Sequence, residues 1–389
     1  MTKHLISSLV FLGTTFFASA QNGNQNDRAN DVQLNAITTA VPFLNIAPDS
    51  RSSAMGDAGV ATSPDVNSIH WNPAKLAFVT EDVEFGLSYS PWLRSLVPDM
   101  NIAYLSAYKR INKISTIGGS LRYFSLGKIS FTDDNGDPIR DFTPVEFAID
   151  GAYALKLSER LSSGVSLRYV RSNLTGGSII PGAETKPGQS VAFDVSAFYR
   201  SKKFQVADKP ATLNAGINIS NVGNKMAYTN ASSTDEDFIP TNLKLGTALN
   251  VDVDEYNAVT FTVDFNKLLV PTPNGDLDSG NVSPVEAIFG SFNDAPGGSK
   301  EELREINIGG GIEYRYTDQL AFRAGYFNEH ETKGNRKFIT FGAGFHYSAF
   351  QFDLSYLLSV RQNNPLANTL RFSLTFAFDN SAADSSEKL

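Results

Sequence analysis

The sequence predicts an all-β fold: a transmembrane antiparallel β-barrel of about 14 strands with an N-terminal hatch, or plug. Three observations predict it. From Glu81 onward, apolar and polar residues alternate with period two, as in strands with one apolar and one polar face. Each alternating run has about ten residues, which is the length that a tilted strand needs to cross a bilayer. The connections between the runs alternate between long and short.

Composition narrows the class of protein. The chain has 389 residues, a formal net charge of −8 and only 19% charged residues, together with 28 Phe and 14 Tyr. The acidic balance, without a basic run, argues against nucleic acid as a partner. Cysteine is absent, which excludes disulfide scaffolds, thiolate metal sites, a cysteine nucleophile and an N-terminal lipoprotein anchor.

Residues 1–20 are predicted to be a signal peptide. An apolar stretch from Leu5 to Ala18 follows a short polar start, and Ala18-Ser19-Ala20 is a cleavage site of the A-x-A type. A short buried helix is the alternative. Residues 21–31 are rich in Asn and Gln, so we expect a disordered linker there.

Residues 32–80 do not alternate and are rich in Ala, Asp, Gly and Ser. A segment of this kind before a barrel can fold into its lumen, where charged lumen side chains need polar partners. We therefore expect an N-terminal hatch in or under the barrel lumen. The alternative is a periplasmic tail.

Residues 81–378 are predicted to form the barrel. In one typical run, Val259, Phe261 and Val263 alternate with polar residues. The runs lie near 83–91, 101–110, 115–127, 144–157, 161–173, 189–200, 211–221, 241–250, 257–268, 304–316, 319–328, 337–347, 350–359 and 368–378. An even number of strands is typical of single-chain barrels of the bacterial outer membrane.

The connections predict the orientation of the chain. Counted from the first run, odd-numbered connections are mostly long and even-numbered ones mostly tight. Outer-membrane barrels have short periplasmic turns and long extracellular loops. We therefore predict a protein of the outer membrane of a Gram-negative bacterium, with extracellular long loops. Both termini, including a tail at residues 379–389, are expected to be periplasmic.

The two faces of the predicted strands differ in polarity. One face carries large apolar residues, and the other carries Gly, Ser, Thr, Asn and charged side chains. A charged side chain facing lipid near the midplane would cost about 2–4 kcal/mol, so the charged residues are expected in the lumen. These residues are Asp150, Arg168, Asp194, Lys244, Glu313, Arg323 and Asp353. A large soluble β-sandwich is the alternative fold.

Short sequence words resemble those of a known family. Gly59-Val60-Ala61, Asp65 and Trp71-Asn72-Pro73 are similar to the hatch of FadL-like long-chain fatty acid transporters, which are fourteen-stranded barrels. Longer words at 37–44, 47–51, 55–65, 88–93, 121–127 and 289–298 resemble the PorV family, FadL-like outer-membrane proteins of the type IX secretion system. The hatch motif of this resemblance comprises Gly56, Asp57, Asp65, Trp71, Asn72 and Pro73.

The resemblance implies an outer-membrane shuttle component of that secretion system. Such a protein binds the C-terminal signal domains of cargo proteins at the SprA-like translocon barrel. It then delivers the cargo to the cell-surface attachment complex, which has a PorU-like peptidase-like subunit. Outer-membrane lipid and lipopolysaccharide are further expected partners. The alternative is a FadL-like transporter of hydrophobic small molecules, which needs an apolar lumen pocket and a path past the hatch.

Two predicted outer loops are unusually apolar, which marks candidate contact surfaces for cargo or for partner proteins. The first loop reads P-W-L-R-S-L-V-P over residues 91–98, and the second spans residues 269–303. The alternative is that these side chains pack against the barrel rim or lipid headgroups. The candidate contact residues are Trp92, Leu93, Leu96 and Val97 in the first loop and Ile288, Phe289 and Phe292 in the second.

The sequence offers little that could support catalysis. The three histidines after the signal peptide share no spacing, and the chain contains no G-x-S-x-G or Walker A pattern. Residues 133–137 and 274–278 resemble calcium loops but lack the Glu at the twelfth position, and turn chemistry explains them. We therefore expect no enzyme activity, no cofactor and no metal. A lipopolysaccharide-modifying enzyme of the outer leaflet is the alternative in this class.

Overall fold

The computed structural model describes residues 34–94, 96–133, 135–177, 185–229, 236–273, 282–360 and 366–378. Its contacts divide the chain into residues 1–34 and a compact unit of residues 35–389. Of the first part, only Leu34 is described, and it is exposed. The predicted signal peptide, linker and C-terminal tail lie outside the described residues.

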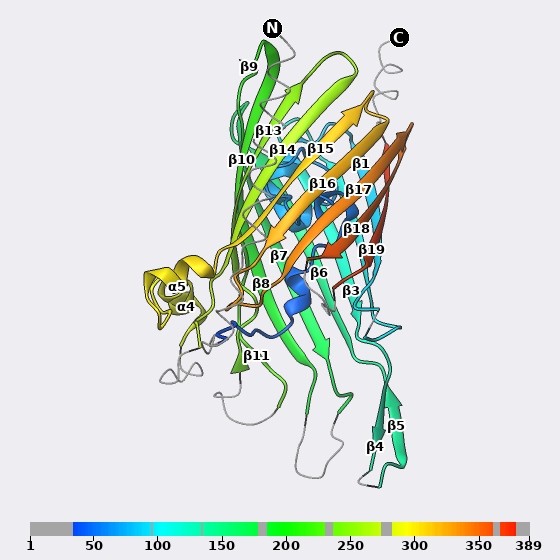
Figure 1. Cartoon of the computed structure of the whole chain (residues 1–389), viewed down its shortest axis with the longest axis vertical. Helices are drawn as coiled ribbons and strands as arrows, with labels where there is room; N and C mark the ends of the chain where they lie inside the picture. Colours follow the sequence, from blue (N-terminus) through cyan, green and yellow to red (C-terminus); the bar gives the residue numbers. More distant parts are fainter. Residues whose placement is uncertain are drawn as a thin grey trace. The chain divides into compact units, whose positions relative to one another are not determined.

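Residues 83–378 form a closed antiparallel barrel of fourteen strands, as the sequence predicts (Figure 1). The ring closes where the last strand pairs with the first, for example Leu374 with Leu87. Its strands are β1 (Val83–Pro91), β2 (Asn101–Arg110), β3 (Ser115–Ser125), β6 (Val145–Lys156), β7 (Leu161–Asn173), β8 (Gly188–Arg200), β10 (Lys209–Gly223), β13 (Asn242–Asp252), β14 (Asn257–Leu268), β15 (Asn307–Tyr316), β16 (Leu320–Asn328), β17 (Lys337–Tyr347), β18 (Phe350–Ser359) and β19 (Thr369–Phe378).

Alternation along the strands sorts side chains between the outer wall and the lumen. In β1, Phe85 and Leu87 are exposed on the outer wall, whereas Glu84 and Ser88 are buried inside. The seven charged residues that the sequence places in the lumen are all buried. An apolar outer wall around a polar interior is what a bilayer requires of a barrel.

The two ends of the barrel differ in their connections. The tight-turn end carries the short turns at 111–114, 157–160, 317–319 and 348–349, and the long-loop end carries the long connections. The long-loop end also holds small additional elements. These are the hairpin of β4 (Ile129–Thr132) and β5 (Pro138–Phe142), the ladder of β11 (Met226–Ala227) and β12 (Glu236–Asp237), and the helices α4 (Pro284–Gly290) and α5 (Ser299–Arg304).

Two local predictions need correction. The run predicted at 304–316 begins only at Asn307, because α5 extends to Arg304. The connection between β3 and β6 is not simply a loop, because it contains the β4–β5 hairpin. A short edge strand, β9 (Phe204–Val206), also pairs with β10 at the tight-turn end.

No helix in the described part of the chain is both long and apolar enough to span a membrane.

Residues 35–80, which we call the hatch, run through the lumen from the long-loop end to the tight-turn end. At the long-loop end, the backbone N–H of Asn35 donates to Thr332 O at 2.9 Å, and that of Ala40 donates to Phe238 O at 2.9 Å. At the other end, the chain enters β1 beside the end of β19, where Val83 pairs with Phe378. Asn35 and Phe378 therefore lie at opposite ends of the barrel. The hatch contains η2 (Pro42–Asn45), α2 (Ser50–Ser53), α3 (Ser68–Trp71) and η3 (Pro73–Phe78).

Candidate functional site: the filled lumen and the long-loop surface

A buried ionic network joins the hatch to the barrel wall. Arg51 of α2 donates two hydrogen bonds to Glu313 of β15, both at 3.0 Å, and a third to Asp65 at 3.0 Å. Arg323 of β16 bonds the same Glu313 at 2.7 Å and Asp353 of β18 at 2.6 Å. Breaking one partner out of such a buried network costs several kcal/mol, so the network holds the hatch firmly.

A second network lines the opposite wall. Arg168 of β7 bonds Asp150 at 2.5 Å and Asp194 at 3.2 Å, which places three charged side chains side by side in the lumen. Nearby, Arg122 of β3 donates to the carbonyl oxygens of Phe43, at 3.1 Å, and Leu44, at 2.7 Å. This guanidinium therefore holds the end of the hatch that lies nearest the long-loop end.

The hatch motif forms the centre of the plug. Asp49 caps α2 by accepting from Ser52 N at 2.8 Å, and it also accepts from Trp71 Nε1 at 2.6 Å. Asn72 caps η3, whose first residue is Pro73, and its side-chain amide donates to the carbonyl oxygen of Ala197 in β8 at 3.1 Å. Helix caps of this kind fix short helices that have few internal hydrogen bonds.

The remaining motif residues also lie in the plug. Asp65 bonds Arg51, and Gly56 N donates to Thr340 Oγ1 of β17 at 3.0 Å. Asp57 has a positive φ of 57° and lies within electrostatic reach of Arg371. The structure therefore gathers the predicted motif into one unit inside the barrel.

Glycines on the lumen face of the strands allow the hatch to touch the wall. A Cβ on Gly325 of β16 would lie 2.2 Å from Gly56 N, and a Cβ on Gly164 of β7 would lie 2.3 Å from Ala74 N. No side chain fits in such a gap. The hatch backbone therefore packs directly on the strand backbone.

Apolar side chains fill the lumen on the long-loop side of these networks. Phe43 and Leu44 of η2 pack into a buried cluster with strand and loop residues, and Phe43 stacks on Phe124 with ring centroids 6.0 Å apart. The cluster comprises Ala40, Val41, Phe43, Leu44, Trp92, Ile102, Phe124, Ala148, Val170, Ala192, Met226 and Ile239. The space that a hydrophobic solute would need is thus occupied by the hatch itself.

A cavity of about 570 Å³ opens at the tight-turn end between the hatch and the wall. Nine of its 25 lining residues are charged, including Arg51, Asp65, Glu84, Arg323 and Asp353. An apolar ligand would have to desolvate these groups, so the cavity suits water or polar solutes rather than hydrophobic ones.

The first predicted contact loop is only partly exposed. Trp92 is only 8% exposed, and the guanidinium of Arg371 lies 5.5 Å from its ring centroid. Leu93 packs against the same buried cluster, and Val97 is half-buried. Aromatic burial against the lumen cluster outweighs exposure here, which is the rim-packing alternative. Leu96 remains exposed, at 63%.

The second predicted loop does present an apolar surface. It contains α4, on which Val285, Ile288 and Phe289 follow the spacing of one helix face, and Phe292 follows just after the C-cap. Phe289 is 76% exposed, whereas Ala287 on the other side is buried. The two loops connect β1 to β2 and β14 to β15, so they leave different arcs of the ring. The predicted residues therefore do not form one continuous patch.

The start of the hatch packs in the same apolar cluster as the buried side of α4. Ala287 packs in a small cluster with Phe238, Val270, Val282 and Ile37, the last from the start of the hatch. Ser283 caps the helix by accepting from Glu286 N at 3.2 Å, with Pro284 as the first helical residue. The words Ser-Pro-x-Glu could have predicted this helix start from sequence.

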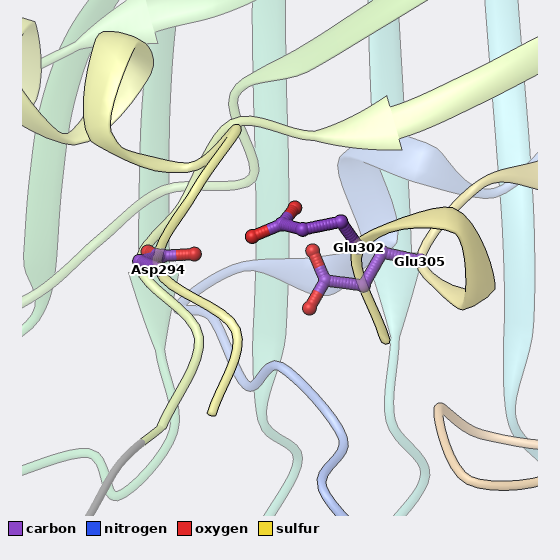
Figure 2. Close-up of side chains that lie close together, drawn as sticks. All are labelled: Asp294, Glu302 and Glu305. Carbon is purple, nitrogen blue, oxygen red and sulfur yellow. The ribbon is translucent and has the colours of Figure 1, made fainter. Parts of the chain in front are cut away.

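Carboxylates of Asp294, Glu302 and Glu305 converge beside α5 (Figure 2). Two lysines already bond the two glutamates: Lys267 reaches Glu305 at 2.5 Å and Glu302 at 2.9 Å, and Lys333 reaches Glu305 at 2.9 Å. These ammonium groups supply the positive charge that a metal ion would bring. We therefore describe the group as a clasp, which ties the α4–α5 loop to β14 and to the loop after β16.

Comparison with known families identifies one match. The model of the family described as type IX secretion system protein PorV matches residues 28–275, which is more than half of the chain. No curated protein matches the sequence significantly.

Of the similar solved structures, TodX supports the same fold. The toluene transporter TodX of Pseudomonas putida is 12% identical, with a TM-score of 0.50 over 89% of this chain and 99% of that chain. The toluene transporter TbuX of Ralstonia pickettii is 14% identical, with a TM-score of 0.46 over 85% and 98% of the two chains. A FadL homologue of Pseudomonas aeruginosa is 12% identical, with a TM-score of 0.44 over 89% and 100%. At this identity, the likeness to TodX concerns the fold alone.

Proposed function

Because the chain belongs to the family of the type IX secretion system protein PorV, we propose that it is the outer-membrane shuttle component of such a system. In this role it binds the C-terminal signal domains of cargo proteins at a SprA-like translocon barrel. It then delivers them to the attachment complex with its PorU-like subunit. The family match over residues 28–275 is the observation that carries the proposal.

The lumen supports this proposal over the transport alternative. Phe43 and Leu44 fill its apolar part, and the Arg51 network ties the hatch to the wall in its polar part. A transporter of hydrophobic molecules needs a free apolar pocket with an exit, whereas a docking protein can use a barrel that is filled. No metal or cofactor is part of the proposal.

The proposal also assigns an orientation. The long loops are extracellular, where cargo and the attachment complex would meet them, and the tight turns face the periplasm. Residues 1–20 are the signal peptide, 21–31 a linker, 32–80 the hatch, 81–378 the barrel and 379–389 a periplasmic tail. Outer-membrane lipid and lipopolysaccharide surround the barrel.

The deciding experiment is a deletion of the gene, followed by proteomics of periplasm, cell surface and medium. We expect proteins with the C-terminal signal domain to accumulate in the periplasm or to lose their surface anchoring. Intact secretion together with a loss of uptake of a hydrophobic nutrient would contradict the proposal and favour the transporter.

A second experiment tests the contact surface. Phe289→Ser removes the most exposed aromatic ring of α4, and we expect lower recovery of cargo in pull-downs from an otherwise wild-type strain. Leu157→Ser is the matched control, because Leu157 is 57% exposed but lies in a tight turn at the other end of the barrel. Equal recovery with both variants would remove α4 from the proposal.

A further inference from the structure

The first residues of the hatch, 35–40, are held by loops of the long-loop end, and we call them the hatch start. The backbone N–H of Asn35 donates to Thr332 O at 2.9 Å, and its side-chain amide donates to Glu301 Oε1 at 2.9 Å. In Figure 1, the dark blue start of the hatch runs toward the yellow α4–α5 loop. The hatch start is therefore bonded to α5 and to the loop after β16.

A cavity of about 370 Å³ lies between the hatch start and the barrel wall. Its lining includes Ile37, Thr38 and Thr39 of the hatch start, together with Leu268 and Asn307 at the ends of β14 and β15. Deeper in the lumen, by contrast, the hatch backbone packs directly on strand glycines. Segments with few buried contacts open most easily, so the hatch start depends on its loop contacts more than the rest of the hatch does.

The helix α4 depends in turn on the hatch start. A helix of seven residues is not stable by itself and needs packing against other elements. Ala287 supplies this packing, in the cluster with Phe238, Val270, Val282 and Ile37. Ile37 is therefore a hatch side chain that supports the exposed apolar face of α4.

Phe238 links the backbone of the hatch start to the same cluster. Its carbonyl oxygen accepts from Ala40 N at 2.9 Å, and its side chain packs with Ala287 and Ile37. A shift of the hatch start would thus disturb α4 through a side chain and through a backbone hydrogen bond. Conversely, disorder in α4 would expose more of Ile37 to water.

We propose that the hatch start positions the contact surface of α4, which comprises Val285, Ile288 and Phe289, so that the seated hatch start and the ordered helix stabilise each other. By linkage, a partner that binds the ordered helix also favours the seated hatch start. A barrel whose hatch start is not seated would therefore bind the partner weakly. The partner is a cargo signal domain, so this inference rests on the proposed function.

Two isoleucine-to-serine variants of the full-length protein in lipid nanodiscs test the coupling. Ile37→Ser removes the hatch side chain that packs with the buried side of α4. Ile46→Ser is the matched control, because Ile46 is also a partly buried hatch residue but packs against the cluster around Phe43. Ile37→Val keeps an apolar side chain at this place and should behave as wild type. Heat-modifiable migration in gels verifies that all these barrels fold.

Hydrogen exchange measures the coupling without any partner. In the wild type, Ala287 N donates to Ser283 O and Ser291 N donates to Ala287 O, both at 2.9 Å. We expect Ile37→Ser to speed exchange at these two amides about tenfold, because apolar burial that holds the helix is lost. Ile46→Ser should change it by less than about twofold. Unchanged exchange in a folded Ile37→Ser barrel would overturn the coupling.

Asn35→Ala is a milder second variant, for the case that Ile37→Ser does not fold. It removes the hydrogen bond to Glu301 and leaves the apolar cluster intact. We expect exchange in α4 to become about threefold faster, the effect of losing one hydrogen bond. The same exchange as in the wild type would again overturn the coupling.

Binding measures the functional half of the proposal, with the purified C-terminal signal domain of a secreted protein as the probe. We expect Ile37→Ser to weaken binding about tenfold and Ile46→Ser by less than about twofold, and binding to the wild type should slow exchange at Ala40 N. Faster exchange in α4 with unchanged binding would overturn the positioning role and leave the proposed function standing. Absence of any binding by the wild type would overturn the proposed function and with it the positioning role, even where exchange shows the coupling.

Discussion

At the scale of single residues, the buried arginine of the hatch makes a sharp prediction. Arg51→Met removes three charge-assisted hydrogen bonds and leaves Glu313 and Asp65 without this partner in the lumen. We expect the free energy of unfolding to fall by about 3–5 kcal/mol, the usual cost of breaking a buried ion pair. Urea titration of the folded fraction in lipid vesicles measures it.

The control for Arg51 is an ion pair of similar geometry at the surface. Lys203 and Asp252 lie 3.3 Å apart, and both are exposed. Lys203→Met should leave the urea midpoint unchanged, because solvent and salt screen such pairs. If the two variants lost stability equally, the lumen network would not be what holds the hatch.

A second residue-scale prediction uses two strand glycines. Gly325→Ala puts a methyl group 2.2 Å from Gly56 N, whereas Gly151→Ala points into open space on the outer wall. We expect the first variant to lose the heat-modifiable folded band. The second should fold as well as wild type or slightly better, since alanine restricts the unfolded chain. Normal folding of Gly325→Ala would mean that the hatch does not press on β16.

At the scale of elements, Glu301 of α5, which shares Lys333 with the clasp, predicts a dependence on pH. Burial opposes ionisation of Glu301, but Lys333 at 2.5 Å and Asn35 at 2.9 Å outweigh it and hold the pKa of that carboxyl below its ordinary value. A lowered pKa in the folded state means that the contact stabilises the fold above the ordinary pKa. The stabilisation is lost as the pH falls through the folded pKa.

Limited proteolysis at pH 6 and at about pH 3.5 measures this effect, because glutamate ordinarily titrates near 4.3. The segment 282–306 should become susceptible at the lower pH while the barrel stays intact. Glu301→Gln should show the susceptibility at both values. Cleavage that does not depend on pH in the wild type would contradict the role of Glu301.

The elements also show how far sequence alone reaches. Strand positions follow from alternation, because lipid on one side and a polar lumen on the other impose it along every run. The predicted run at 304–316 starts too early, because Ile306 alternates with Ile308 and so continues the strand pattern back before the start of β15. The β4–β5 hairpin escapes prediction since both its faces are solvated in part, so its pattern carries no lipid signal.

Some residues of the candidate site could also be placed from the sequence, and others could not. Charged residues of the strands, such as Glu313, are placed in the lumen by solvation cost alone, and the structure agrees. The sequence leaves the place of Trp92 open, because an apolar loop residue can pack against a partner protein or against its own hatch. Only three-dimensional packing, here the lumen cluster around Phe43, separates these possibilities.

At the scale of the whole molecule, the filled lumen predicts a barrel that does not conduct. Reconstituted wild-type protein should cause no swelling of liposomes in arabinose, while a general porin in parallel vesicles does. Arg51→Met combined with Asp264→Asn, which weakens the hydrogen bonds from Gly59 N and Val60 N, should raise permeability. Rapid swelling with wild type would show an open path past the hatch.

The course of the hatch has a mechanical consequence. The hatch enters the barrel at one end, beside Thr332, and β1 begins at the other end. Residues 35–80 therefore pass through the whole length of the barrel. In a single-molecule pulling experiment with the force applied just before Asn35, residues 35–80 should be pulled out of the barrel before the force reaches any strand. The first force peak should therefore release a length on the order of 150 Å, and the barrel wall would yield only after it.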